Sequence, residues 1–351
     1  MNELLETIRS GAELDGIGVA ALCAILLDES ESVEARAGLL AALSAKGETP
    51  AEIAWFVRTL LSHARPIEIR PTGAPVMDVC GTGGDRHGLF NISTATMFVA
   101  AACGVRVVKH GNRGVTSKCG GADVLEALGI RIDLEPAQAS AMLDDVGCVF
   151  LFAQKFHPAF KAVAPVRKLL AGQGVTTIFN KLGPLLNPAA PSFQLAGVFD
   201  PAMVPVYGKV FAELGRKRAW AVHGRIESGD VQGGLDEMST LGTTDVCAVE
   251  GERLESLTLD SADYGIPRPA LADLAGGDAA HNAALLEALL RNRLSGPIRD
   301  MVEWNTAGAL VVAGIAPDPA AGLAAAREAL RAGEAAARLD AMRAASAALP
   351  E

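Results

Sequence analysis

Two apolar runs that each end in a glycine-rich polar loop constrain the fold more than any other part of the sequence. Residues 76–80 form the first run and lead into the loop GTGGD at 81–85; a helix-like apolar stretch follows over 91–104. The second run, 105–108, leads into KHGNR at 109–113, again before a helical pattern. Strands that alternate with helices indicate a parallel sheet, so we expect both loops to meet at one sheet edge.

These two loops have the composition of an anion site. Ligands of open α/β sheets bind outside the carboxyl ends of the strands, where helix amino termini offer free N–H groups. Glycines allow the backbone to come close to a ligand, and Lys109, Arg113 and Lys118 supply positive charge. The sequence therefore predicts recognition of a polyphosphate or a pyrophosphate ester.

The common nucleotide motifs are absent from this stretch. The third glycine of a dinucleotide fingerprint would fall at Arg86, and the chain contains no G-x-x-x-x-G-K-[ST] sequence. The alternative is that the glycines only make tight turns. Hydroxyls and cations accompany glycines on both loops, and we therefore favour the anion site.

The rest of the chain fits an α/β class with a helical start. Residues 1–65 show helical patterns only, and Thr49, Pro50 and Glu52 form the signature of a helix amino terminus with a capping box. Pro66 and Pro71 mark the boundary to the sheet.

Strand and helix patterns continue to alternate beyond residue 129. We expect a helix at 136–146, strands at 148–152, 193–199 and 218–222, and helices from about residue 285, with an Ala-rich amphipathic segment at 319–348. The predicted architecture is a small amino-terminal helical domain followed by a large domain with a mostly parallel sheet flanked by helices.

Composition limits the partners and the compartment. The formal net charge of −10 argues against nonspecific binding to nucleic acid or to an anionic membrane. The start MNELLETIRS lacks a signal-peptide pattern, and no apolar run reaches membrane-spanning length, so we expect a cytoplasmic protein. Six cysteines without a C-x-x-C pair indicate buried free thiols, and histidine spacing gives no sign of a zinc site.

Residues 146–199 contain no Asp or Glu but carry Lys155, Lys161, Arg167, Lys168 and Lys181. A long stretch whose charged residues are all positive favours a site for an anionic substrate. The alternative is a basic surface that binds an acidic subunit. A planar guanidinium at position 167 suits a planar aromatic carboxylate.

Asp236 and Glu237 are adjacent carboxylates in a loop that we expect to be exposed. Such a pair suits Mg²⁺, which keeps waters and substrate phosphate oxygens in its shell. Taken alone, a single Asp-Glu pair is usually solvated surface. Together with the predicted phosphate loops, it favours a magnesium site.

Long motifs in this chain resemble the anthranilate phosphoribosyltransferase family, which has the nucleoside-phosphorylase-like fold. They include GTGGD, NIST, KHGNRGVTSK and ADVLEALG, and later HPAFKAVAPVRKLL, TIFNKLGPLLNP and GLDEMST. The resemblance covers nearly the whole chain. It implies transfer of a phosphoribosyl group from phosphoribosyl pyrophosphate to anthranilate in tryptophan biosynthesis, with Mg²⁺.

The resemblance also implies site residues and an assembly. Phosphoribosyl pyrophosphate would be held by Gly81, Gly84, Asp85, Asn91, Ile92, Ser93, Thr94, Lys109, His110, Gly111, Asn112, Arg113, Gly114, Val115, Thr116, Ser117 and Gly121. Anthranilate would contact Gly81, Asn112 and Arg167, and the metal would be bound by Ser93, Asp236 and Glu237. The helical domain, residues 1–70 joined in space by a segment near 160–185, would form a homodimer contact; residues 71–351 would form the transfer domain.

Three positions depart from the family pattern. Arg86 replaces a common Gly, Leu89 a common Ser or Thr, and Gly121 a common Ser. Our hypothesis is that Arg86, with His87, replaces the missing donors to pyrophosphate. Two rival functions remain, a pyrimidine nucleoside phosphorylase and a noncatalytic nucleic-acid-binding relative. The acidic pair and the KHGNR loop disfavour the first, and the net charge disfavours the second.

Overall fold

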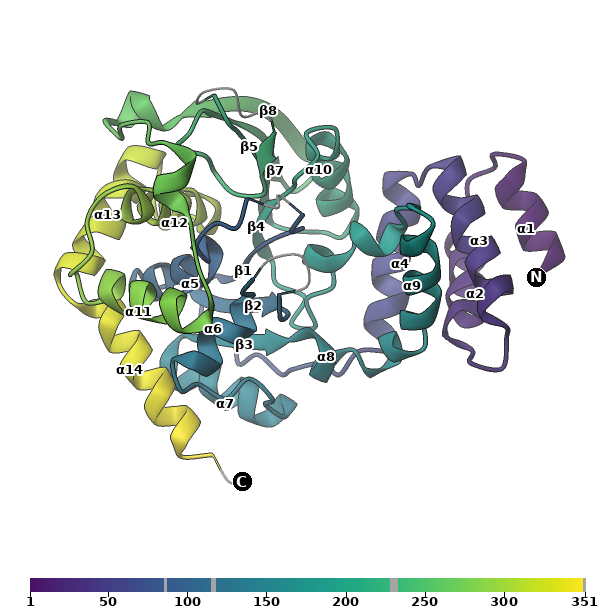
Figure 1. Ribbon diagram of the computed structural model, residues 1–351, viewed down its shortest axis with the longest axis horizontal. Helices are drawn as coiled ribbons and strands as arrows, with labels where there is room; N and C mark the ends of the chain where they lie inside the picture. The colour runs from purple at the N-terminus through teal and green to yellow at the C-terminus, as the bar shows by residue number, and fades with distance from the viewer. Residues whose placement is uncertain (85–86, 115–117, 228–232, 350–351) are drawn as a thin grey trace.

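The computed structural model describes residues 1–84, 87–114, 118–227 and 233–349. The chain begins with a compact group of helices, seen on the right of Figure 1. They are α1 (Asn2–Arg9), α2 (Gly16–Leu27), α3 (Val33–Lys46) and α4 (Pro50–Ser62). The helical start expected from the sequence is therefore confirmed.

The predicted capping box at α4 is present and extends into the core of the helical domain. The Thr49 side chain accepts the N–H of Glu52, and the Glu52 carboxylate accepts the N–H of Thr49 over 2.9 Å. Glu52 is fully buried, and it also accepts the N–H of Leu14 and a 2.7 Å contact from the Lys46 ammonium. One carboxylate thus joins α4, α3 and the turn before α2.

An eight-stranded sheet forms the centre of the large domain, in the order β3, β2, β1, β4, β5, β7, β8, with β6 beside β5. The pairs from β3 to β5 are parallel, and β6, β7 and β8 join antiparallel. The strands are β1 (Val76–Gly81), β2 (Arg106–Gly111), β3 (Cys148–Phe152), β4 (Phe193–Gly197), β5 (Arg218–Arg225), β6 (Gly234–Leu235), β7 (Thr243–Glu250) and β8 (Arg253–Asp260).

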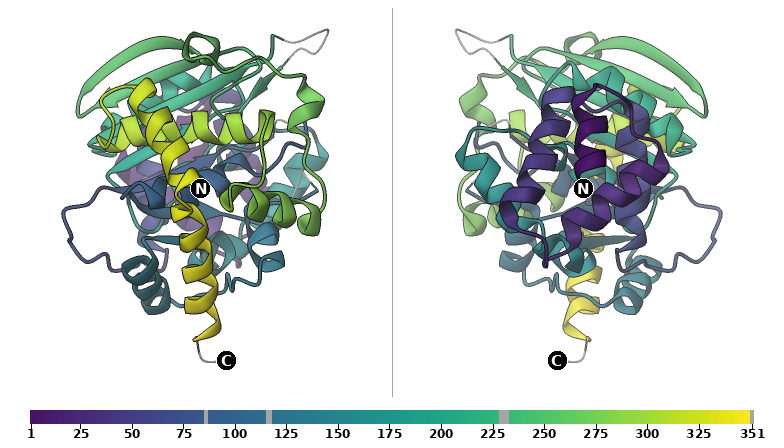
Figure 2. Two further views of the ribbon diagram at one scale, coloured as in Figure 1. Left: turned by 90° about the vertical axis from the view of Figure 1, so that its left-hand side faces the viewer. Right: turned by 90° about the vertical axis from the view of Figure 1, so that its right-hand side faces the viewer.

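Of the remaining helices, α9 (Ala164–Gly172) lies with the amino-terminal helices, and most of the others pack along the sheet (Figure 1). The other longer ones are α5 (Ile92–Ala102), α6 (Gly121–Ala127), α7 (Pro136–Val146), α10 (Met203–Glu213), α11 (Ala279–Leu290), α12 (Pro297–Ala313), α13 (Pro319–Arg331) and α14 (Glu334–Ala347). The short ones are α8 (Ala153–Phe156), η1 (Pro158–Lys161), η2 (Ile178–Asn180), η3 (Gly183–Leu185), η4 (Ser261–Tyr264) and η5 (Leu271–Leu274). Figure 2 shows α14 on one side of the molecule and the amino-terminal helices on the other.

Buried apolar side chains form two cores. One core joins α5, α12, α13 and α14 to one face of the sheet. The other joins α1 to α4, α9 and α10 to the opposite face, where Ala196, Ala219 and Ala221 are buried. α9 packs against α3. The domain boundary near residue 70 stays a prediction.

The structure differs from the sequence-based expectations at three places. The hairpin of β7 and β8 was not predicted, although Gly251 (φ +59°) makes its turn between two runs with apolar alternation. The segment 319–348 is two helices, because Gly333 (φ +77°) breaks it. The last helical third begins at Ala279 rather than near residue 285.

The six cysteines form no disulfide within the part of the chain that the structure describes, and all but Cys103 are buried, as expected. Among the described residues, no helix combines the length and the apolar character needed to cross a membrane.

Candidate active site

The helix that follows the first glycine loop has an uncapped amino terminus. Asn91 stands at the N-cap of α5, but its side chain makes no cap hydrogen bond. Its amide donates instead to the carbonyl of Cys119 over 3.2 Å, and its Oδ1 accepts from Asn282 over 2.8 Å. The side chain thus links the start of α5 to α11 and to the loop before α6. The N–H of Ile92 donates to the Phe90 carbonyl over 2.8 Å, and the Asn91 side chain does not cap the rest of the first turn, so the positive end of α5 can face an anion.

Lys109, at the end of β2, joins that helix to the sheet. Its ammonium donates to the carbonyl of Val79 over 2.7 Å and to the Ser93 hydroxyl over 3.1 Å, and the side chain is only 4% exposed. The buried Asp78 carboxylate accepts the N–H of His110 over 3.2 Å. Burial raises the pKa of Asp78, and the positive charge of Lys109 opposes that shift. The ends of β1, β2 and α5 therefore form one charged unit.

The loop with Asp236 and Glu237 lies across the carboxyl ends of β1, β4 and β5. A Cβ on Gly81 would lie 2.1 Å from the Asp236 carboxylate, and one on Gly224 would lie 2.5 Å from the Glu237 carbonyl oxygen. A Cβ on Gly197 would meet the Asp236 main chain. The Asp236 carboxylate also accepts the N–H of Gly83 over 2.6 Å.

This packing corrects the expectation that the acidic pair is exposed. Both Asp236 and Glu237 are only partly exposed, because glycines at three strand ends admit their main chain into the sheet edge. Gly83 (φ +70°) and Gly84 (φ +102°) form the facing loop in a backbone conformation that favours glycine. The glycines of GTGGD thus both shape the loop and make room for the acidic pair.

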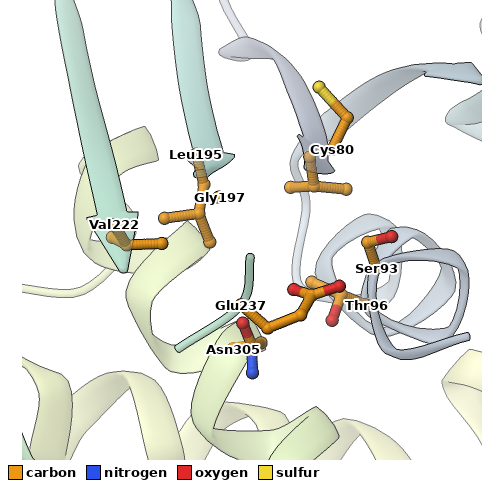
Figure 3. A pocket seen from close by; sticks show the side chains of 9 residues that line it. Cys80, Ser93, Thr96, Leu195, Gly197, Val222, Glu237 and Asn305 are labelled. Carbon is orange, nitrogen blue, oxygen red and sulfur yellow. The ribbon is translucent and has the colours of Figure 1, made fainter. Parts of the chain in front are cut away.

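A small cavity lies between the acidic pair and α5. Its volume is about 10 Å³, and its polar lining comes from Ser93, Thr96, Glu237 and Asn305. Figure 3 shows the Glu237 carboxylate directed toward Ser93 and Thr96. The cavity has room for about one water-sized group.

The residues around this cavity fit a magnesium ion. Mg²⁺ prefers oxygen ligands, and a carboxylate and the Ser93 hydroxyl face the same space. The Thr96 hydroxyl is 1% exposed and has no hydrogen-bond partner among the residues that the structure describes. A buried hydroxyl without a partner costs free energy unless a further group, such as metal-bound water, satisfies it.

A row of rings connects the second loop with the helical side of the molecule. His110 lies 5.3 Å from His157, which stacks on Phe160 at 5.1 Å; Phe160 lies 5.8 Å from Phe179. The Arg167 guanidinium lies over Phe179 at 5.7 Å from the ring centre. Arg167 is thus linked to the phosphate loops through rings, at the end of an aromatic row.

The other predicted residues of the second loop are held by local contacts. Arg113 pairs with Asp123 over 3.2 Å and with Glu126, so much of its charge is already balanced. The Asn112 Oδ1 accepts the N–H of Arg113 over 2.8 Å. The N–H of Gly114 donates to Asp123 over 2.9 Å.

Ile92, Gly111 and Thr94 complete the described part of the predicted phosphate site. Ile92 is a core residue and can serve a ligand only through its main chain. Gly111 faces Phe150, where a Cβ would lie 2.7 Å from the ring. Thr94 is buried beside Gly121 at the start of α6. Asp85, Val115, Thr116 and Ser117 lie outside the described residues.

The acid-free stretch 146–199 is not acid-free in space. Lys155 pairs with Glu135 over 2.6 Å, and Lys181 pairs with Glu48 over 2.6 Å. Acids from other segments therefore balance part of the charge that the sequence shows. Two of the five cations are therefore paired with carboxylates of this chain, which weakens the alternative of a basic surface for an acidic subunit.

Two family models together match most of the chain. A helical bundle domain of the glycosyl transferase family matches residues 2–64, and the a/b domain of the same family matches residues 73–336. The anthranilate phosphoribosyltransferase of Natronomonas pharaonis is 40% identical over 98% of this chain and 99% of its own length. The chain belongs to the anthranilate phosphoribosyltransferase family.

Solved structures of anthranilate phosphoribosyltransferases agree with the fold. The enzyme from Thermus thermophilus is 38% identical, with a TM-score of 0.88 over 98% of this chain and 99% of that chain. The Saccharomyces cerevisiae enzyme in complex with PRPP and Mg is 26% identical, with a TM-score of 0.86 over 99% of each chain. The resemblance inferred from the motifs is therefore confirmed.

The structure accounts for two of the three departures from the anthranilate phosphoribosyltransferase pattern. Leu89 packs against the large core and pairs with Ala275 in an isolated bridge. A Cβ on Gly121 would lie 3.0 Å from the Thr94 hydroxyl, so a serine there would need a shift of its neighbour. Arg86 lies outside the described residues, and the hypothesis that it replaces lost donors stays a prediction.

Sequence reasoning missed three polar residues of the candidate site. Thr96 and Asn305 line the small cavity, and Asn282 holds Asn91. Thr96 lies one turn after Ser93 on α5, so helical spacing could have placed it on the same face. Asn282 and Asn305 lie in segments whose approach to the site depends on tertiary structure.

Proposed function

We propose that this chain transfers the 5-phosphoribosyl group from phosphoribosyl pyrophosphate to the amine of anthranilate, releasing pyrophosphate. The observation that carries the proposal is the meeting of three elements at one sheet edge. They are the uncapped start of α5, the buried Lys109 and the acidic pair Asp236 and Glu237. The full-length similarity to anthranilate phosphoribosyltransferases supports the substrates and the pathway, tryptophan biosynthesis.

In this proposal the pyrophosphate end lies against the glycine loop and the start of α5. N–H groups at a helix amino terminus, with the positive end of the helix dipole, stabilise the charge that the leaving pyrophosphate gains. Lys109 adds a fixed positive charge and orients the Ser93 hydroxyl. The predicted ligands from the loop 109–117 and from Gly121 belong to the same subsite.

Asn112 and Arg167 are proposed to receive anthranilate. A guanidinium pairs with a carboxylate through two parallel hydrogen bonds, and the ring of Phe179 holds Arg167 from one side. In the aromatic row from His110 to Phe179, Phe160 is the partly exposed ring and the others are buried, so the face of Phe160 can take up a planar ring by stacking.

The transfer breaks the bond between ribose C1 and the pyrophosphate oxygen, whose electron pair leaves with pyrophosphate, and forms a bond between C1 and the anthranilate nitrogen, which releases one proton to solvent. The ribose carbon becomes cationic as the leaving group becomes more negative, so positioning and electrostatic stabilisation suffice without a covalent nucleophile. Ser93, Asp236 and Glu237 are the proposed magnesium ligands. Bound Mg²⁺ would neutralise charge on the pyrophosphate.

The direct test mixes the protein with Mg²⁺, phosphoribosyl pyrophosphate and anthranilate and follows the loss of anthranilate fluorescence. We expect loss that needs all three additions. A parallel reaction with uridine and inorganic phosphate tests the phosphorylase alternative. Phosphorolysis of uridine without consumption of anthranilate would reject the proposed function.

We further propose a homodimer that forms through the helical domain of residues 1–70. Large apolar side chains on this domain are exposed, Ile17 by 81% and Trp55 by 38%. Light scattering of the full chain against an Ile17→Glu, Trp55→Glu double variant tests this surface. A cytoplasmic location stays a prediction.

A further inference from the structure

Met238 directly follows the acidic pair. One side chain, that of Asn305, forms hydrogen bonds with both the N–H and the carbonyl of Met238. Its N–H donates to the Asn305 Oδ1 over 2.9 Å, and its carbonyl accepts from the Asn305 amide over 2.9 Å. The same amide donates to the carbonyl of Met301 over 2.9 Å, within α12. Asn305 is 1% exposed, and its hydrogen bonds are all directed at the backbone.

A second feature of α12 holds the same residue. Gly308 lies three positions after Asn305, and therefore on the same helix face. A Cβ there would lie 2.2 Å from the sulfur of Met238, so the fully buried methionine side chain fills the space that the glycine leaves. Polar and steric contacts from one helix thus fix Met238.

Fixing Met238 also fixes the direction of Glu237. The Glu237 carbonyl oxygen lies against Gly224, and its carboxylate faces the cavity lined by Ser93, Thr96 and Asn305. The main chain on either side of the Glu237 Cα is therefore held. Before it, the Asp236 carbonyl lies against Gly197 of β4; after it, the peptide unit between Glu237 and Met238 contacts Gly224 of β5 and Asn305 of α12. Because this backbone is fixed, the Glu237 carboxylate can adopt few orientations.

We propose that Asn305 is a positioning residue for the cation site: it holds the backbone at Met238 so that the Glu237 carboxylate faces Ser93. This inference rests on the proposed function, because that function assigns the cation to Glu237 and Ser93. Groups that orient metal ligands change metal affinity by about 10- to 100-fold when they are replaced. The Asn305 side chain acts through its two hydrogen bonds to the Met238 main chain.

The test compares Asn305→Asp and Asn305→Leu with the parent protein. Asp keeps the size but turns the amide donor into an acceptor that faces the Met238 carbonyl. Leu removes the two hydrogen bonds to Met238 and the one to Met301. The control is Thr306→Val, the next residue on α12. Thr306 is also buried, and its hydroxyl has no hydrogen-bond partner among the described residues.

Mn²⁺ binding in the presence of phosphoribosyl pyrophosphate, measured by electron paramagnetic resonance, gives a readout apart from turnover. We expect the Mn²⁺ dissociation constant to rise at least about tenfold in both Asn305 variants and to stay within about twofold in Thr306→Val. The KM for anthranilate should change much less than the Mg²⁺ concentration for half-maximal activity. Gly308→Ala, which leaves the Asn305 bonds in place but displaces the Met238 sulfur, should raise the same constant by a smaller factor.

Two results separate the failure of this inference from that of the proposed function. If the parent protein binds Mn²⁺ and an Asn305 variant that folds binds it equally well, Asn305 has only a structural role and the inference is wrong. If neither Asn305 variant folds, Gly308→Ala decides, because it displaces Met238 by another route. Unchanged Mn²⁺ binding in Gly308→Ala would show that the position of Met238 does not determine cation affinity, and would overturn the inference. If the parent protein itself binds neither Mn²⁺ nor phosphoribosyl pyrophosphate, the proposed function fails and this inference fails with it.

Discussion

Gly197 and Asp236 are in such close contact that no other residue type fits at position 197. A Cβ there would lie 1.6 Å from the Asp236 carbonyl oxygen, which belongs to the backbone and cannot rotate away. The end of β4 and the acidic loop are therefore fitted to each other, although 39 positions separate them in the chain (236 minus 197).

We predict that Gly197→Ala displaces the acidic loop and abolishes most turnover, with a stability cost of about 1–3 kcal/mol from overpacking. Urea unfolding and the anthranilate assay measure the two effects. Gly38→Ala is the control, because a Cβ at this helical glycine meets nothing within 4 Å and should stabilise by up to about 1 kcal/mol. Normal turnover in Gly197→Ala would contradict the close contact between position 197 and the Asp236 main chain.

The contrast between these two glycines shows what the sequence could and could not predict. Local patterns determine β1, the start of α5 and the capping box of α4, and those predictions are confirmed. The need for glycine at position 197 depends on the approach of the loop that carries Asp236, which lies elsewhere in the chain. A single sequence gives no signal for such an approach. For the same reason the ion pair between Lys155 and Glu135 could not be predicted from the sequence.

Glu237→Gln should lower turnover by more than about 100-fold, because it removes a charged oxygen from the proposed magnesium ligands while keeping the size. Asp236→Asn should lower it too, with a larger loss of stability, since Asp236 also accepts the N–H of Gly83. Turnover at a series of Mg²⁺ concentrations and thermal unfolding distinguish the two. Unchanged turnover of Glu237→Gln at limiting Mg²⁺ would reject the assignment.

Arg167→Ala should raise the KM for anthranilate by about 10- to 100-fold, the loss expected for a charge-assisted hydrogen bond of about 1.5–3 kcal/mol. The KM for phosphoribosyl pyrophosphate should change far less. Lys168→Ala, at the exposed neighbouring position, is the control. An equal rise in both KM values would move Arg167 to the phosphate side of the site.

Glu52→Ala should destabilise the protein by about 3–5 kcal/mol, because it leaves the Lys46 ammonium without its buried partner and two N–H groups without an acceptor. Denaturant unfolding measures the change in free energy. Glu34→Gln, an exposed residue on α3, should change stability by no more than about 0.5 kcal/mol. Similar values for the two variants would show that the buried network contributes little.

Burial, together with the charges of His157 and Lys109, lowers the pKa of His110 from an ordinary value of 6.5 to about 3. Between these two values the unfolded chain binds a proton that the folded chain does not, so stability falls as the pH drops below about 6.5. His110→Gln removes this proton uptake. We predict that its unfolding temperature falls less than that of the parent between pH 7 and pH 5; equal falls would contradict the prediction.

The second apolar core also bears on how this chain is made. Helices α1 to α4 leave the ribosome first, yet their core is completed by α9, by α10 and by sheet residues as late as Val249. Most of the polypeptide must therefore be synthesised before the amino-terminal helices reach their final packing, and their apolar faces stay open to chaperones until then. A shortened gene that begins after α4 would leave the apolar sides of α9 and α10 that pack on α3 and α4 uncovered, so insolubility is the first defect to expect from it.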